Sequence, residues 1–390
     1  MSITIRGGTQ AINFGGVMVM VGSLPAGASW AQVASTSSNH AILSSTGALY
    51  VWGRGALGTM GDGTTVAKSS PVQISGSWSF ISGGANHFAA IRSDGSLWCW
   101  GANALGQLGD GTTVNRSSPV QAASGSWVAT GCTGEVTWAL KSNGTLWGTG
   151  TNVDGEIPDW PALNGGYSNL VQIGTDTDWS RSIMYTIESY VPYGSALKTD
   201  GSLWQWGTQY GTLVVDQTQD DIDTGFVVVP RKAPGTTSWA AIAATAYNMA
   251  AIHSDGTLWA WGSVAQTSIA AGNGDGTTVD RSSPVQISAS SWTAIASGYE
   301  AFIAIRSDGT LWAWGYNVNG ALGNSSTVQI TPLTQVSTSS WRQISMGRSC
   351  IGIKSDGTVW TWGLGLVGQL GDGTTIARSS PVQLLSLIHI

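Results

Sequence analysis

The sequence Ile91–Gly101, IRSDGSLWCWG, decides the fold because versions of it recur along the whole chain. Ser93-Asp94-Gly95 is a turn in which Asp caps the backbone and Gly adopts a positive φ. The strand that follows, Leu97-Trp98-Cys99-Trp100, is apolar or small on both faces, so packed layers should lie on both sides of it. The other six copies are Ser45–Gly53, Ser142–Gly150, Thr199–Gly207, Ser254–Gly262, Ser307–Gly315 and Ser355–Gly363.

The spacing of the copies indicates the architecture. From the first aromatic residue of one copy to that of the next, the intervals are 48, 49, 57, 55, 53 and 48 residues. A repeat of about this length suits one four-stranded blade. Each unit begins with Ser-Trp-x-x-Ile/Val. The motif Ser-Ser-Pro-Val-Gln is expected in the strand at the outer edge of the blade, where proline is tolerated. The sequence therefore predicts an all-β, seven-bladed β-propeller.

Three segments are predicted. Residues 29–384 form the propeller. Residues 1–28 hold an apolar run, Phe14–Leu24, before Ala26-Gly27-Ala28, which is typical of a cleavable leader; the alternative is a strand that anchors or closes the ring. Residues 385–390 (LSLIHI) are more apolar than the ends of the other repeats. They are either a cloning or sequencing artefact or an apolar tail strand.

The array Gly95–Gly111 resembles the RCC1 repeat, named for the regulator of chromosome condensation, and the resemblance covers about Trp30 to Gln383. It implies a seven-bladed propeller. Members of that family include a nucleotide-exchange factor for a small GTPase and a secreted inhibitor of β-lactamase, both of which act through protein contacts on a propeller face. The family's histidine ahead of the hairpin is matched by His40 and His87 only.

Composition narrows the class of protein. Only 10% of the 390 residues are charged, and the net charge is −6. The basic residues recur at fixed repeat positions and are spread around the ring, so no nucleic-acid partner is expected. The three cysteines have neither a paired spacing nor an even count, which excludes a disulfide framework or zinc site. No segment has the roughly 20 apolar residues of a transmembrane helix. The low charge favours an extracellular or virion surface, the alternative being the cytoplasm.

Tryptophan is the conspicuous residue, with 21 copies. Eighteen occupy repeat positions and are expected to pack blades, with Trp259 deep between them. The Gly-Trp-Arg-His-Thr motif of the plant UV-B receptor, a relative in the RCC1-repeat family, is absent, which disfavours photoreception. Three tryptophans depart from the pattern: Trp138, Trp160 and Trp179.

Trp179 belongs to an apparent insertion, Gly174–Pro192, that combines aromatics, carboxylates and one arginine as binding hot spots do. The alternative is that the alternating stretch Ser182–Tyr190 extends the blade. We expect replacement of the insertion by a short turn to leave the fold intact. Together with the loops on the ring face, the candidate ligand-binding residues are Asp176, Asp178, Trp179, Arg181, Tyr185, Glu188, Tyr190, Trp160, Trp138, His40, His87 and Tyr299.

The sequence gives no positive indication of catalysis. The Asp-Gly carboxylates recur in unit after unit, which predicts turn capping rather than one active site. His40 and His87 lack a third ligand at matching spacing, so structural hydrogen bonding is favoured over metal or base chemistry. No catalytic residue, metal or cofactor is predicted.

These observations favour a non-catalytic scaffold that binds a protein or glycan, as a monomer or within a larger assembly. Two alternatives from other classes remain. One is a guanine-nucleotide-exchange-type regulator of a small GTPase, because the exchange factor in the family uses an inserted hairpin as a wedge. The other is a propeller hydrolase or lyase.

Overall fold

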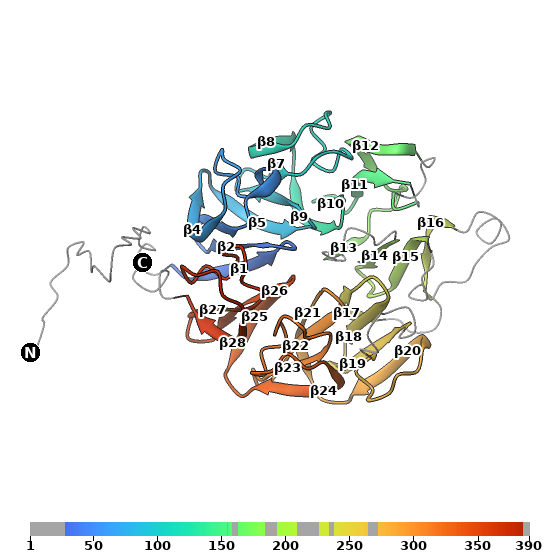
Figure 1. Cartoon of the computed structure of the whole chain (residues 1–390). Coiled ribbons are helices and arrows are strands. Elements are labelled where there is room, and N and C mark those ends of the chain that lie inside the picture. The colour runs from blue at the N-terminus through green and yellow to red at the C-terminus, as the bar shows by residue number, and fades with distance from the viewer. Residues whose placement is uncertain are drawn as a thin grey trace, which may run out of the picture.

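The computed structural model describes residues 28–153, 155–157, 163–183, 193–208, 226–233, 238–263 and 272–384. Within these residues the chain forms seven four-stranded antiparallel sheets, each made of four consecutive strands. The sheets follow one another around a ring, so that the first and the last are neighbours (Figure 1). The predicted all-β, seven-bladed β-propeller is confirmed.

Every blade repeats the same four strands. The first strands are β1 (Trp30–Ser35), β5 (Trp78–Gly83), β9 (Trp127–Thr133), β13 (Trp179–Ile183), β17 (Trp239–Ala244), β21 (Trp292–Gly298) and β25 (Trp341–Met346). The second strands are β2 (Asn39–Ser44), β6 (His87–Arg92), β10 (Val136–Lys141), β14 (Tyr193–Lys198), β18 (Asn248–His253), β22 (Ala301–Arg306) and β26 (Ser349–Lys354). The third strands are β3 (Leu49–Gly53), β7 (Leu97–Gly101), β11 (Leu146–Asn152), β15 (Leu203–Thr208), β19 (Leu258–Gly262), β23 (Leu311–Gly315) and β27 (Val359–Gly363). The fourth strands are β4 (Lys68–Ile74), β8 (Arg116–Ala123), β12 (Leu163–Gln172), β16 (Phe226–Lys232), β20 (Arg281–Ser288), β24 (Ile330–Ser337) and β28 (Arg378–Gln383).

Burial varies from strand to strand across a blade. All residues of β2 and of β3 are buried, whereas β8 has no buried residue. Strands buried on both faces need a packed layer on each side, and the neighbouring blades supply those layers. The fourth strands lie at the outer edge of the ring (Figure 1), which is where the prolines of β4 and β8 are tolerated.

Neighbouring blades are joined by a contact between tryptophan and glycine. The indole N–H of Trp100 in β7 donates to the carbonyl of Thr59, in the loop that follows the third strand of the preceding blade, at 3.1 Å. At Gly61 in that loop, which has φ 72°, a Cβ would lie 2.8 Å from the same indole nitrogen. The loop glycine therefore makes room for the next blade's tryptophan. The equivalent hydrogen bonds run from Trp52 to Gln369, from Trp206 to Glu156 and from Trp362 to Ala321.

The turns between second and third strands are capped as predicted. In the last blade, Asp356 Oδ1 accepts from the Thr358 backbone N–H at 2.8 Å and from its hydroxyl at 2.6 Å. Thr358 Oγ1 in turn accepts from the indole N–H of Trp360. The Lys354 ammonium lies 3.7 Å from the Trp360 ring centroid and 5.1 Å from that of Trp341, close enough for cation–π attraction. The turn carboxylates thus stabilise the hairpin turns by capping backbone and hydroxyl donors.

The ring closes through side chains rather than through a shared strand, because β1–β4 and β25–β28 each form a complete sheet. Across this seam, Arg342 donates to Trp30 O and Gln343 to Ala31 O, each at 2.6 Å. Buried residues of the two blades form one apolar cluster, which includes Trp52 from the first blade. In the part of the chain that the structure describes, no helix has the length and hydrophobicity needed to cross a bilayer.

His40 and His87, which the sequence offered as binding candidates, are completely buried between blades. His40 contacts the hydroxyls of Ser35 and Ser349, each at 2.9 Å, and so belongs to the seam. Because Thr137 donates its only proton to Gln107 O, it must accept from His87 Nε2. Both histidines hold blades together, as the structural alternative predicted.

Trp261 and Trp259 form a matched pair for testing the blade interface. Trp261 is fully buried between blades, whereas Trp259 is only partly buried. The prediction that Trp259 lies deep between blades was therefore wrong, and the deeply buried tryptophan is two residues further along β19. We expect Trp261→Ala to cost about 3–5 kcal/mol, because it leaves a large cavity, and Trp259→Ala to cost clearly less. Denaturant midpoints of the two variants check this. Equal losses would contradict the burial difference.

The buried histidines predict a loss of stability in mild acid. Burial lowers the pKa of His40 to about 3 and that of His87 to about 4, so both stay neutral in the folded chain. The unfolded chain takes up these protons below about pH 6.5, which favours unfolding as the pH falls. Between pH 7.5 and pH 5 we expect a loss of about 2 kcal/mol per histidine, measured as the shift of the denaturant midpoint. His87→Gln should remove its share of the slope, and an unchanged slope in that variant would refute the assignment.

Candidate functional site

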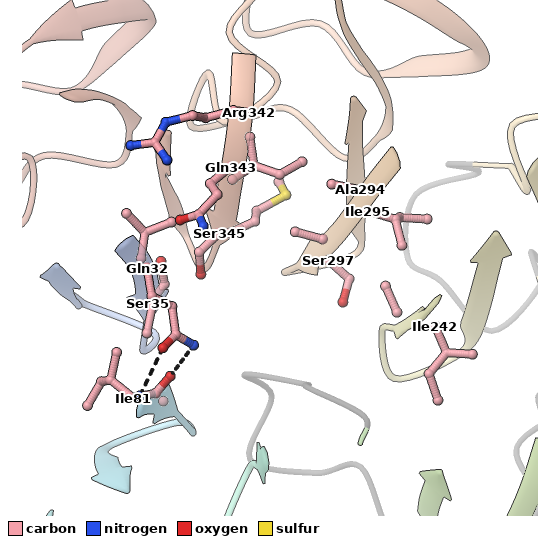
Figure 2. A pocket seen from close by; sticks show the side chains of 17 residues that line it. Gln32, Ser35, Ile81, Ile242, Ala294, Ile295, Ser297, Arg342, Gln343 and Ser345 are labelled. Carbon is pink, nitrogen blue, oxygen red and sulfur yellow. Dashed lines mark hydrogen bonds between the residues drawn. The ribbon is translucent and has the colours of Figure 1, made fainter. Parts of the chain in front are cut away.

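The first strands enclose a central cavity of about 260 Å³ (Figure 2). Its wall comes from five blades, through β1, β5, β17, β21 and β25. These strands carry the Trp-x-x-Ile/Val pattern, so their small and branched residues, such as Val33, Ile81 and Ile295, face the centre of the ring. From the sequence these residues are recognisable only as the starts of strands, because nothing in the local sequence shows that five distant segments line one cavity.

Polar residues occur on more than one side of the cavity wall, since Ser297 lies among the apolar residues of β21 and β17. Figure 2 shows Arg342, Gln343 and Ser345 of β25 on one side of the cavity and Ala294, Ile295 and Ile242 on the other. A further polar residue, Gln32 of β1, is hydrogen-bonded to the neighbouring blade. Its side-chain amide donates to Ile81 O at 2.9 Å and accepts from the Ile81 N–H at 3.1 Å. The wall contains no Asp, Glu or His among the described residues.

An aromatic cluster lies on the face of the ring where the first strands end. We call this the loop face, because it also carries the long loops after the third strands. The cluster consists of Tyr299, between β21 and β22, Tyr316, after β23, and Arg348, between β25 and β26. The tyrosine ring centroids are 5.6 Å apart, and the Arg348 guanidinium carbon lies 5.1 Å from the Tyr299 ring centroid.

The backbone around the aromatic cluster is held in a defined shape. Glu300 has a positive φ of 52°, which is rare for a residue other than glycine, and its carbonyl accepts from the Tyr316 N–H at 2.9 Å. Burial also raises the pKa of the Glu300 carboxyl. The three side chains are therefore displayed on fixed loops. Of the three residues, only Tyr299 was a candidate from the sequence; Tyr316 and Arg348 were missed. Arg348 could have been noticed because the first blade has Ser38 at the equivalent position of the repeat.

The acidic candidates lie on the opposite face. Asp176 and Asp178 are exposed in the connection between β12 and β13, 2.7 Å and 3.0 Å from the Lys198 ammonium. Lys198 also lies 4.3 Å from the Trp204 ring centroid, the position that Lys354 has in the last blade. The two carboxylates thus neutralise a repeat cation, and they are separated from Tyr299 by the thickness of the ring.

Two of the tryptophan candidates, Trp179 and Trp138, are buried in the packing of the blades. Trp179 is 3% exposed and begins β13, the first strand of the fourth blade, in the position of Trp78. Gly174–Pro192 is therefore not an insertion as a whole, and replacing it would remove a blade strand. Trp138 is 1% exposed and packs 5.3 Å from the Trp206 ring centroid. Arg181 of β13 is exposed.

The remaining candidates, Tyr185, Glu188, Tyr190 and Trp160, lie outside the described residues. Among the residues that are described, no group of three or more His, Cys, Asp or Glu side chains is placed to hold a metal ion.

Comparison with known proteins identifies the repeat. Models of the regulator of chromosome condensation (RCC1) repeat match residues 46–91, 94–140, 308–352 and 356–390, and a second model of the same repeat matches 78–107 and 292–321. A search of curated proteins finds no match.

Solved structures share the architecture. Prp20p from Saccharomyces cerevisiae is 17% identical, with 88% of this chain and 87% of that chain covered and a TM-score of 0.74. Yeast RCC1 (Prp20) in its complex with Kap60 is 18% identical over 86% and 83% of the two chains, with a TM-score of 0.73. Human WBSCR16 is 18% identical over 85% and 87%, with a TM-score of 0.68. The repeat matches and the ring of seven blades together show an RCC1-like repeat protein with the β-propeller fold.

Proposed function

We propose that the protein is a non-catalytic scaffold that binds a protein partner through its loop face, with the aromatic cluster of Tyr299, Tyr316 and Arg348 at the centre of the contact. The observation that carries the proposal is the packing of an arginine and a half-buried tyrosine against an exposed tyrosine. Tyr299 is 39% exposed, and its ring lies close to both the Tyr316 ring and the Arg348 guanidinium. Tyrosine and arginine are the residue types that most often dominate protein–protein binding energy.

The fixed backbone strengthens this interpretation. A loop that is already ordered loses little conformational freedom when a partner binds, so more of the contact energy appears as affinity. The positive φ of Glu300 and its hydrogen bond to Tyr316 give the aromatic cluster such a support. Backbone conformations of this kind cost free energy and persist only where surrounding contacts hold them.

Relatives with the same fold bind proteins. Yeast RCC1 (Prp20) has been crystallised bound to Kap60. The Prp20p structure was reported together with the binding of Prp20p to Gsp1p and histones. At 17–18% sequence identity, the similarity to these structures supports a shared fold but not a shared partner. The binding face of the present chain is therefore argued from its own residues.

A protein partner is favoured over the other classes. The described cavity wall holds no carboxylate or histidine for hydrolase or lyase chemistry, and the turn carboxylates are occupied in capping. No described residue points specifically to GTPase exchange. A glycan partner and a location on a cell or virion surface stay predictions from composition.

Single substitutions in the aromatic cluster test the proposed function. The partner is first isolated from extracts of the source with the intact protein, and its dissociation constant is then measured by calorimetry. We expect Tyr299→Ala and Arg348→Ala each to weaken binding about 10- to 100-fold, as truncated hot spots do.

Arg54→Ala is the matched control, since Arg54 is an exposed arginine on a loop of the same face in the first blade. It should leave the affinity within about twofold, as residues outside a hot spot do. A partner whose affinity is unchanged by both cluster variants, or reduced equally by Arg54→Ala, would refute the assignment of the site.

A further inference from the structure

Exposed apolar side chains are confined to one face of the ring. Among the described residues, ten large hydrophobic side chains are exposed, and nine of them lie in connections between third and fourth strands. The tenth is Tyr299, in a connection between a first and a second strand. In an antiparallel blade both kinds of connection leave from the same end, which is the loop face. The described residues of the opposite face include no exposed large hydrophobic side chain, so the loop face is the apolar one.

Five of these side chains occupy one position of the repeat. Each stands two residues before the residue that pairs with the last glycine of the third strand, so all five lie at equivalent places above their blades. We call them the aliphatic rim: Val66, Val114, Val279, Val328 and Ile376, which are 54–69% exposed. The rim extends over five consecutive blades, from the fifth through the seventh to the second.

The loops hold the rim side chains in a fixed arrangement. In the second blade, the Val114 N–H donates to Thr112 Oγ1 at 3.3 Å, and the Thr112 N–H donates to Asp110 Oδ1 at 3.0 Å. The same two hydrogen bonds recur at Val66 and at Ile376. A surface held in this way loses little conformational freedom when it is covered.

Folding does not account for the aliphatic character of the rim. The residue after each rim position is also exposed, and it varies from Ala67 and Ala377 to Asn115 and Asp280. The rim position itself is valine or isoleucine in all five blades. Threonine has the same branched shape at Cβ and would offer water a hydroxyl in place of a methyl group. An exposed aliphatic residue that recurs where threonine would serve the fold favours a contact outside the chain.

The distribution of charge favours a second copy of the chain as the occupant. The net charge is −6, so two copies repel each other unless they meet through a face without excess charge. On the loop face, four aspartates form ion pairs with the cations that begin the fourth strands. The other described charges of these connections that are not buried nearly cancel, since Arg54 and Arg348 stand against Glu135, Asp280 and Glu300. On the opposite face, the aspartates of five Asp-Gly turns are exposed.

The aliphatic rim is complementary to itself. Because its five blades are consecutive, a two-fold axis through the seventh blade brings the first blade over the sixth of another copy, and the second over the fifth. Val66 of one copy then meets Val328 of the other, and Val114 meets Val279. Ile376, in the seventh blade, meets its own equivalent.

We propose that two copies of this chain form a closed homodimer through their loop faces, with the aliphatic rims in contact. Dimer formation depends on the rim and not on the proposed partner site. The dimer also covers the aromatic cluster, so a second copy and a partner compete for the loop face; this consequence alone rests on the proposed function.

Sedimentation of the purified full chain tests the dimer without any partner. Between about 1 µM and 1 mM, the range of affinities of modest interfaces, we expect a concentration-dependent change from one copy to two. Because the rim contacts are apolar, higher salt should leave the dissociation constant within about twofold. A chain that stays monomeric throughout, or that forms open-ended assemblies, would overturn the proposal. Neither result would affect the partner site, whose test measures affinity at the aromatic cluster.

Charged substitutions test which rim positions face each other. Val66→Asp and Val328→Lys should each weaken the dimer about 10-fold or more, because each brings a charge into an apolar contact. The double variant should recover most of the affinity, since each aspartate then faces a lysine of the other copy. Val66→Asp combined with Val279→Lys should not recover, because these two positions are not opposite each other.

Ser290→Asp is the matched control for charge, since Ser290 is exposed in a connection on the opposite face. It adds the same charge as Val66→Asp and should leave the dissociation constant within about twofold. Melting temperatures of all variants confirm that the exposed substitutions leave the ring folded. Unchanged association in both single rim variants, or equal recovery in the two double variants, would refute the proposed pairing of the rims.

Discussion

The contact between a buried indole and a loop glycine is the constraint on which the rest of the structure depends. A propeller blade has two apolar faces, and neither is stable until another blade covers it. The second tryptophan of the third strand reaches across to the preceding blade, and in the first, second, fourth and seventh blades its N–H donates to a backbone carbonyl there, as Trp100 does at Thr59. The indole fits only because Gly61 has no side chain there, and Gly371 provides the same space for Trp52 across the seam. Tryptophan in one repeat and glycine in the previous one are thus parts of a single interaction.

The third blade shows how the ring keeps its packing where the repeat departs from this rule. Thr149 stands where the other blades have the second tryptophan, and its hydroxyl donates its one proton to a backbone carbonyl, with Tyr167 O the nearer acceptor at 2.6 Å. The lost aromatic volume reappears as Trp138 on the adjacent strand. That ring is accommodated by Gly148 directly opposite, where a Cβ would lie 2.7 Å from it. Volume and hydrogen bonding are conserved in the blade although the sequence motif is not.

Much of the fold could be predicted because its determinants are local and repeated. The Asp-Gly turns, the strand alternation and the proline edges each follow from a few neighbouring residues, and all of them are found where expected. The first strand of the fourth blade was taken for part of an insertion because Asp178, rather than serine, precedes Trp179. The cavity and the aromatic cluster could not be predicted in full, since their residues come together only when the ring closes.

Repeats also provide an internal reference for what the fold itself requires. The blade needs its tryptophans, its turn Asp-Gly and its loop glycines, and these recur with little change. It does not need Arg342, where β17 and β21 have Ala240 and Thr293, nor Tyr316, where the second blade has Ala102. These departures cluster in the sixth and seventh blades, at the cavity and on the loop face. Folding does not require these residues, and the positive φ of the neighbouring Glu300 costs free energy, so both features agree with the proposed binding function of the loop face.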